Sequence, residues 1–68
     1  MDLKIEVEQE VDGRWIAEVM QLPGVLAYGP SPEIAVAKVQ ALALRVLADR
    51  LEQGESGADL MSISFQVA

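Results

Sequence analysis

Acidic side chains are the groups in this chain whose number and spacing come nearest to supporting catalysis or metal binding. They alternate along the first segment and recur once in the next, at Glu6, Glu8, Glu10 and Glu18. Such carboxylates could hold a divalent cation only if several of their oxygens converged in a concave site. A row on the open face of a strand does not provide that concavity. We therefore expect no catalytic residue, no metal ion and no cofactor.

The rest of the composition narrows the chemistry further. The chain has no histidine and no cysteine, which excludes thiol nucleophiles, zinc-finger spacings and imidazole acid–base catalysis. Ser62 and Ser64 have neither a histidine base nor a glycine elbow, so they are not candidate nucleophiles. Taken alone, the acidic row is typical of a solvated strand face that protects a sheet against aggregation.

Length and charge limit the classes of partner. Sixty-eight residues allow one domain, and a chain of this size buries only about 60% of the surface that its unfolded form exposes. Without a disulfide or a zinc site to add stability, we expect a homodimer or a higher even-numbered oligomer. Eleven acidic and five basic residues give a net charge of −6, which disfavours direct binding to nucleic acid. We expect no membrane span and no signal peptide, and hence a cytoplasmic location.

Three segments alternate between apolar and polar residues, which predicts strands, and a short third strand is expected after the turn Leu22-Pro23-Gly24. In chain order the four strands are residues 3–11, 14–20, 25–28 and 60–67. A three-residue loop of Val11, Asp12 and Gly13, with Gly13 left-handed, would join the first two strands with their apolar side chains on one face. This register predicts the cross-strand pairs Ile5–Val19, Val7–Ala17 and Glu10–Arg14.

Residues 30–54 predict one long helix. Ser31 can act as the N-cap, Pro32 suits the first helical position, and Glu33 is favourable at the positive end of the helix dipole. The apolar arc is too wide for one sheet to cover, so part of it needs a second neighbour. Gln40 lies within this arc, and we expect its amide at the rim of an interface or hydrogen-bonded to a loop. The flank expected to mediate self-association comprises Ala37, Leu44, Leu47 and Leu51.

The order of elements is βββαβ, which predicts an α+β fold. A three-stranded antiparallel meander, a right-handed crossover through the helix and a fourth strand parallel to the first give a four-stranded mixed sheet of order 3-2-1-4. The long helix would cover one face of this sheet. The side chains of the last strand expected to face the helix are Met61, Ile63, Phe65 and Val67.

The same arrangement resembles the first half of the ribonuclease H fold. The metal-binding acids of that fold have no complete counterpart here, because the fourth strand offers Ser62 and Ser64 and the helix offers Gln40 or Lys38. A residual metal-dependent nuclease is therefore kept only as a third alternative.

Local motifs resemble those of the HicB-like antitoxin family. The resemblance rests on three elements: the hairpin run Asp12–Val19, the turn Leu22–Val25, and a helix start formed by Tyr28, Gly29, Ser31, Glu33 and Ala35. In the family these are an acidic-glycine hairpin, a Leu-Pro-Gly turn and a Gly-Asp-Ser/Thr-x-Glu-Glu-Ala helix start. The match extends from about Leu3 to Leu51. It departs at Pro30, where the family usually has Asp, and at Ile34, where it often has Glu.

The resemblance implies a partial ribonuclease H-like fold without nuclease activity. It further implies that the chain neutralises a small basic RNA-cleaving toxin of the HicA type by covering its active site. Many members continue into a helix-turn-helix or ribbon-helix-helix domain. Here we expect one HicB-like domain over residues 1–68 and no DNA-binding domain.

With this resemblance, the acidic row becomes a candidate toxin-facing surface as well as a candidate solvated face. Complementary charge accelerates encounter with a basic partner. The toxin-facing residues would be Glu6, Glu8, Glu10 and Glu18. The alternative function is that of an orphan homo-oligomeric domain that binds a small ligand or serves as a scaffold.

Overall fold

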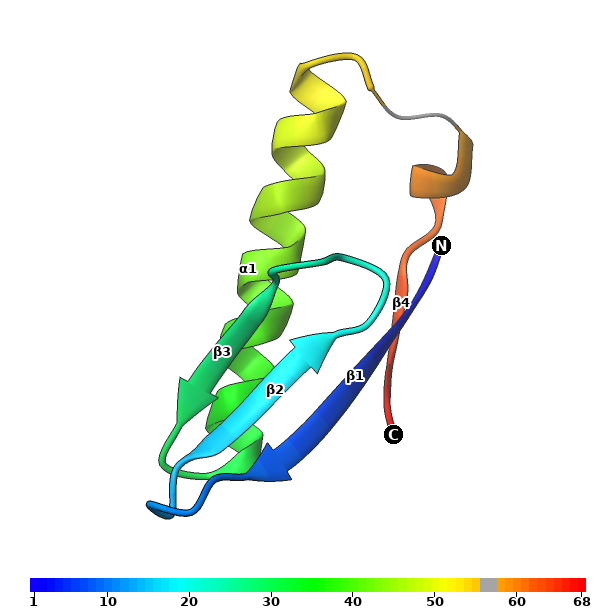
Figure 1. Cartoon of the computed structure of the whole chain (residues 1–68). Helices are drawn as coiled ribbons and strands as arrows, with labels where there is room; N and C mark the ends of the chain where they lie inside the picture. The colour runs from blue at the N-terminus through cyan, green and yellow to red at the C-terminus, as the bar shows by residue number, and fades with distance from the viewer. Residues whose placement is uncertain (56–57) are drawn as a thin grey trace.

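The computed structural model describes residues 1–55 and 58–68 and has an α+β fold. One long helix, α1 (Pro32–Glu52), lies on one face of a mixed sheet (Figure 1). The strands run in the order β3-β2-β1-β4, with β1 antiparallel to β2, β2 antiparallel to β3, and β1 parallel to β4. The predicted fold class, sheet order and parallel closure are therefore confirmed. The strands are β1 (Asp2–Gln9), β2 (Trp15–Val19), β3 (Leu26–Gly29) and β4 (Ser64–Val67).

The hairpin between β1 and β2 has the predicted register. Beyond the end of β1, the Glu10 N–H donates to the Arg14 carbonyl at 2.7 Å, which closes the three-residue loop. Gly13 has a φ of 92°, the left-handed conformation that glycine adopts without steric cost. The cross-strand pairs Ile5–Val19 and Val7–Ala17 follow from this loop.

The helix begins as its sequence predicts. The Ser31 side-chain oxygen accepts a hydrogen bond from the Ile34 N–H at 3.2 Å, and Pro32 is the first helical residue. At the other end Gln53 is the C-cap and Gly54 has a φ of 75°. The buried row steps by four residues, which keeps it on one face of the helix. This row is Ala35, Val39, Ala43 and Leu47.

The core lies between this row and the inner face of the sheet. Leu22 and Val25 join it from the turn after β2, where the Val25 N–H donates to the Leu22 carbonyl at 3.0 Å. Gly29 allows β3 to approach the helix closely, because a Cβ atom there would lie only 2.7 Å from the Ala35 nitrogen. The sheet supplies the remaining buried residues, Leu3, Ile5, Ala17 and Val19.

The last strand differs from the prediction at its start. Residues Ala58–Met61 form the 3₁₀ helix η1, and β4 begins at Ser64, not Leu60. The prediction that Met61 faces inward is wrong, since this side chain is 88% exposed. The physical reason is that β1 begins at Asp2, which pairs with Ser64, so earlier residues have no neighbouring strand. Of the connector predicted over residues 55–59, residues 56 and 57 lie outside the described part of the chain.

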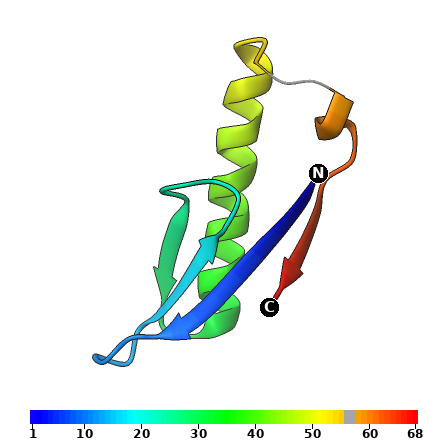
Figure 2. The ribbon, with the colours of Figure 1, turned by 45° about the vertical axis from the view of Figure 1, so that its right-hand side comes forward.

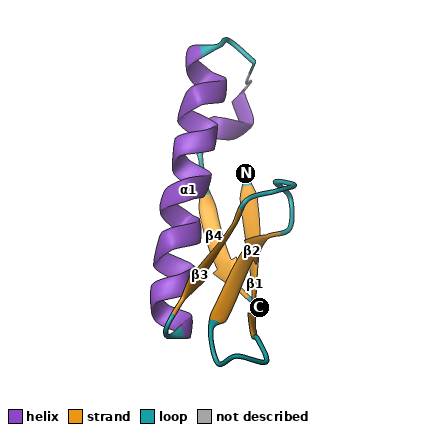
Figure 3. Cartoon of the chain, turned by 60° about the vertical axis from the view of Figure 1, so that its left-hand side comes forward, coloured by secondary structure: helices purple, strands orange, loops and turns teal. Residues whose placement is uncertain are grey.

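The helix is displaced toward one side of the sheet. It packs mainly on β3 and β2, less on β1 and hardly at all on β4 (Figures 1 and 2). The molecule therefore has two layers, as Figure 3 shows, but the helical layer covers only part of the sheet. Within the residues that the structure describes, no helix combines the length and apolar character that a membrane crossing requires.

Candidate functional site

The face of the sheet turned away from α1 carries the predicted acidic row. Glu6 and Glu8 on β1 alternate with inward apolar residues, and both side chains are exposed. Glu18 on β2 is also exposed and pairs directly with Glu6. Glu10 lies beyond the end of β1 and is half-buried. The structure thus gathers three of the four acids in the middle of this outer face and places the fourth at its end.

A small polar cluster surrounds the fourth acid. The Tyr28 hydroxyl donates to Glu10 Oε1 at 3.5 Å, and the Arg14 guanidinium lies 4.5 Å from the centre of the Tyr28 ring. Arg14 Nε also donates to Asp12 Oδ2 at 2.7 Å. The Arg14 backbone N–H donates to Asp12 Oδ1 at 3.0 Å, and this hydrogen bond is the main cause that holds the pKa of Asp12 below its ordinary value of 3.8.

The outer face also has an apolar part beside the acids. Its residues are Ile16 on β2, Met20 directly after β2, and Leu26 and Tyr28 on β3. Met20 is 46% exposed, and Leu26 and Tyr28 are each 37% exposed. We call this surface, from the β1 acids to the β3 apolar side chains, the mixed outer face. The sequence predicted β3 as a strand but did not assign its faces, because residues 25–28 are all apolar and show no alternation.

The acids of the mixed outer face do not form a coordination pocket. Among residues 1–55 and 58–68, no three acidic side chains are grouped closely enough to hold a metal ion. Glu8 stands opposite Ile16, so the carboxylates run along the sheet and do not converge. The geometry offers negative charge over an open surface, which suits a macromolecular partner better than a single cation.

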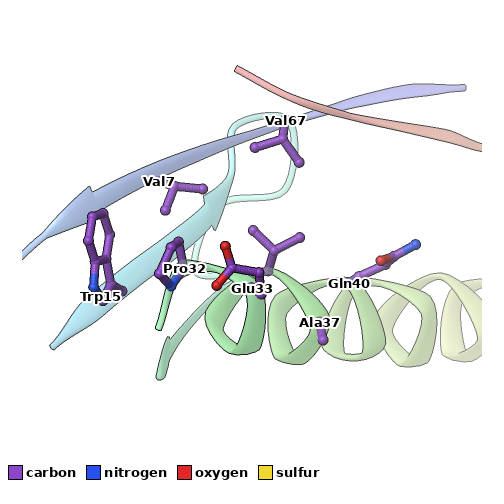
Figure 4. Close-up of a pocket in the computed structure, with 8 residues that line it drawn as sticks. Val7, Trp15, Pro32, Glu33, Ala37, Gln40 and Val67 are labelled. Atoms are coloured by element: carbon purple, nitrogen blue, oxygen red, sulfur yellow. The ribbon is translucent and has the colours of Figure 1, made fainter. Parts of the chain in front are cut away.

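A second feature, an apolar groove, lies on the opposite face and was not predicted. It has a volume of about 590 Å³ and runs between the first half of α1 and the adjoining inner faces of β1, β2 and β4 (Figure 4). The sheet contributes Val7, Trp15 and Val67. Trp15 is half-buried there and packs against the edge of the core. The helix contributes Pro32, Glu33, Val36, Ala37 and Gln40.

The predicted self-association flank divides into two parts. Ala37, Leu44 and Leu51 are exposed, the two leucines to 44% and 52%. Leu47 is only 2% exposed and belongs to the core, because it continues the row of buried residues that steps by four. Three further exposed residues extend the flank along the helix, and we call the whole set the outer stripe. The outer stripe is Ile34, Ala37, Ala41, Leu44, Ala48 and Leu51.

Gln40, the polar residue that the sequence places within the apolar arc of the helix, lies at the groove. It is half-buried and lines the groove wall, and Figure 4 shows its side chain on the groove side of the helix while Ala37 points away from the sheet.

Comparisons with models of protein families, with curated proteins and with solved structures find no match to this chain. The mixed outer face, the apolar groove and the outer stripe are therefore the three surfaces on which a function can be argued.

Proposed function

We propose that this chain is a non-enzymatic interaction protein that binds a small basic protein through the mixed outer face. The observation that supports this most strongly is the direct pairing of Glu6 with Glu18. Like charges in this position destabilise a sheet, so the isolated chain gains no stability from the pair. A basic partner would supply the missing positive charge.

The surroundings of the acids also suit a protein partner. Leu26 and Met20 provide exposed apolar area, and specific interfaces combine an apolar centre with a polar rim. Arg14 is held by Asp12 and Tyr28 at the end of the face, away from the pairing of Glu6 with Glu18. The charges would mainly accelerate encounter, and the apolar contacts would prolong the complex.

The resemblance to HicB-like antitoxins supports a more specific partner. The partner would be a small basic RNA-cleaving toxin of the HicA type, which the chain would neutralise in the cytoplasm by direct binding. An enzyme that binds RNA needs positive charge near its active site, and a negatively charged surface can compete for that site. The proposal needs neither a cofactor nor binding of the chain itself to nucleic acid.

Co-expression with a small basic protein encoded by a neighbouring gene tests the proposal. We expect a co-purifying complex that dissociates as salt is raised, because surface charges are screened. The Glu6→Gln, Glu18→Gln double variant should bind more weakly than the chain itself. The Glu33→Gln, Glu52→Gln variant removes the same charge from the helix and should bind normally. Equal binding by both variants, or no complex at all, would contradict the proposal.

The groove supports a second candidate, in which the chain is a homo-oligomeric domain that binds a small apolar ligand. The groove has a volume of about 590 Å³, which lies within the range of small-molecule sites. Trp15 is the single tryptophan of the chain and lines the groove, so its fluorescence should respond to an occupant. Titration with decanoate should shift this emission if the groove binds apolar ligands. An unchanged spectrum with no bound decanoate by calorimetry would remove this candidate.

Both candidates include self-association through the helix. Ala37, Leu44 and Leu51 remain the proposed contact residues, since they are exposed, whereas Leu47 contributes to the core beneath them. A homodimer is the simplest even-numbered assembly.

A further inference from the structure

The helix α1 has more apolar sides than its own sheet can cover. Its buried row faces the sheet, and four of its six charged residues, Lys38, Arg45, Asp49 and Glu52, share one exposed side, while Glu33 lies at the start of the groove side. At 100° per residue, the groove residues Val36 and Gln40 and then the outer stripe occupy the arc between these two sides. Helices that are apolar on several sides are normally buried within a core. This helix therefore lacks a neighbour on two adjoining sides.

The sheet is also partly uncovered on this side of the molecule, at β4. Phe65 pairs with Leu3 and Val67 with Ile5, so both β4 side chains belong to the face that α1 packs on. Val67 is nevertheless 58% exposed and Phe65 half-buried, because the helix lies over β2 and β3. The Cα radius of gyration is 12.6 Å, against about 11 Å for a compact chain of this length. The single chain is thus less compact than a finished domain.

We propose that two copies of this chain form a three-layer sandwich with both helices in the middle layer. A two-fold axis runs parallel to the helices, which lie side by side in the same direction. Each α1 then rests on β2 and β3 of its own sheet and is covered from the other side by β1 and β4 of the partner's sheet. Each sheet receives its second helix from the other copy. This arrangement rests on the proposed self-association and specifies its geometry, and it does not depend on a toxin.

The order in which the four sides follow one another around the helix fits this arrangement. The buried row contacts its own sheet, the groove side meets the partner's helix, and the outer stripe meets the partner's sheet. The charged side is left in solvent, as its exposure requires. Rotation about an axis parallel to the helix preserves height along it. Ala37, which lines the groove at the level of Val67, then faces the partner subunit's Val67.

The size of the side chains also favours this contact. The first half of the outer stripe is small, with Ala37 and Ala41, and an exposed valine projects from the sheet that would cover it. A small residue opposite a larger one lets two layers interdigitate. The apolar groove is continuous with the stripe through Ala37, so one partner can cover both surfaces together.

Gln40 gains a role in this dimer. The two-fold axis brings Gln40 next to Gln40 of the partner subunit, and each amide can both donate and accept a hydrogen bond. A pair of identical amides between helices satisfies both side chains and fixes their relative height, as single polar residues do in coiled coils. This accounts for a polar side chain within an otherwise apolar arc.

Charge favours self-association through the helical side of the molecule over self-association through the mixed outer face. With a net charge of −6 per chain, contact through the mixed outer faces would bring Glu6, Glu8 and Glu18 of one copy against those of the other, whereas contact through the groove side brings together only the exposed Glu33 of each copy. The proposed sandwich places both outer faces on its two outside layers, as far apart as the assembly allows. A stable dimer buries about 800 Å² of each partner. The chain has a total surface of 4462 Å², of which the groove, the stripe and the β4 side chains form one continuous apolar part.

Disulfide cross-linking tests this geometry, because the chain has no cysteine of its own. Gln40→Cys should form a symmetric disulfide under mild oxidation and run as a dimer on a non-reducing gel. Lys38→Cys on the charged side and Met20→Cys on the mixed outer face should remain uncross-linked. The Ala37→Cys, Val67→Cys double variant should link the helix of one copy to the sheet of the other, and neither single variant should do so.

Light scattering of the unmodified chain separates the remaining outcomes. A mass of twice the 7.4 kDa chain together with the Gln40→Cys cross-link is the expected result. A dimer in which Leu44→Cys cross-links and Gln40→Cys does not would mean that the helices pair through the outer stripe alone, and would overturn the sandwich while leaving self-association intact. Cross-linking of Met20→Cys would place the interface on the outer face. A mass of one chain, with or without decanoate in the groove, would overturn both the sandwich and self-association.

Discussion

Glu6 and Glu18 stand directly opposite each other on β1 and β2, and both side chains are exposed on the mixed outer face. The pair is held in place by the hairpin register, which apolar residues on the other face determine. Moving either acid away would require a slip that also turns Val7 and Ala17 out of the core. The position of the two charges therefore follows from packing on the other face, and their like charge is the observation on which the proposed basic partner rests.

Replacing one member of this pair should stabilise the fold and weaken its function. Glu18→Gln should raise the free energy of unfolding by about 0.5 kcal/mol, since it removes a cross-strand repulsion. It should also slow association with a basic partner. Urea denaturation and stopped-flow binding measure the two effects. Glu52→Gln is the matched control, because Glu52 is exposed on the helix and has no acidic residue opposite it across a strand pair. A loss of stability in Glu18→Gln would show that the pair is not repulsive.

Because of Asp12 in the hairpin loop, the free energy of unfolding of the chain should depend on pH in the acid range. The folded-state pKa of Asp12 is lowered, so its contribution is present above the ordinary value of 3.8 and is lost as the pH falls through the lower folded value. Asp12→Asn should therefore be less stable than the unmodified chain near neutral pH, and the difference should shrink as the pH falls below 3.8. Urea denaturation at a series of pH values measures this. A difference independent of pH would mean that the Asp12 charge contributes nothing.

Two glycines should respond differently to substitution. At Gly29 an added Cβ meets the Ala35 backbone, so Gly29→Ala should lower the free energy of unfolding by about 2 kcal/mol or more. At Gly24 there is open space but a φ of +84°, so Gly24→Ala should cost about 1 kcal/mol through backbone strain alone.

Asparagine separates these two causes, because it tolerates the left-handed conformation better than alanine does. Gly24→Asn should recover part of the stability that Gly24→Ala loses. Gly29→Asn should be no better than Gly29→Ala, because its Cβ is in the same place. Thermal denaturation of the four variants checks this, and recovery at Gly29 would disprove the steric explanation.

Neighbouring leucines of α1 should separate folding from assembly. Leu47→Ala should lower the stability of the chain by about 3 kcal/mol, since Leu47 is buried in the core. Leu44→Lys and Leu51→Lys change exposed side chains, so helical circular dichroism should persist while the assembly becomes smaller. Light scattering measures the mass. An unchanged mass in both lysine variants would remove the outer stripe from the interface.

The sheet could be predicted because alternation and turn chemistry agree. Only a loop of three residues, with Gly13 left-handed, keeps Ile5 and Val19 on the same face, so the register follows from residue types alone. The parallel closure follows from one crossover helix of sufficient length. The buried row of α1 was harder to predict from the sequence, because Leu47 and Leu44 are equally apolar and only contact with the sheet distinguishes them.

The groove could not be predicted, since it depends on where the helix lies across the sheet. No local pattern specifies that displacement, which results from the close approach of Gly29 to Ala35 and from packing on β2 and β3. Met61 was misassigned for a similar reason. Its alternation with Ile63 is that of a strand, but β1 provides no partner at that height, and the Met1 amino group instead donates to the carbonyls of Asp59 and Ser62.

The parallel pairing of β1 with β4 has a consequence for the order of events during synthesis. Asp2 and Ser64 become neighbours only after all the residues between them have been translated. Until then a nascent chain emerging from the ribosome carries β1 with one side unpaired, and a vacant strand edge readily recruits other chains. Rapid synthesis of the segment that forms β4, or a chaperone that shields β1 in the meantime, would therefore raise the yield of correctly folded protein.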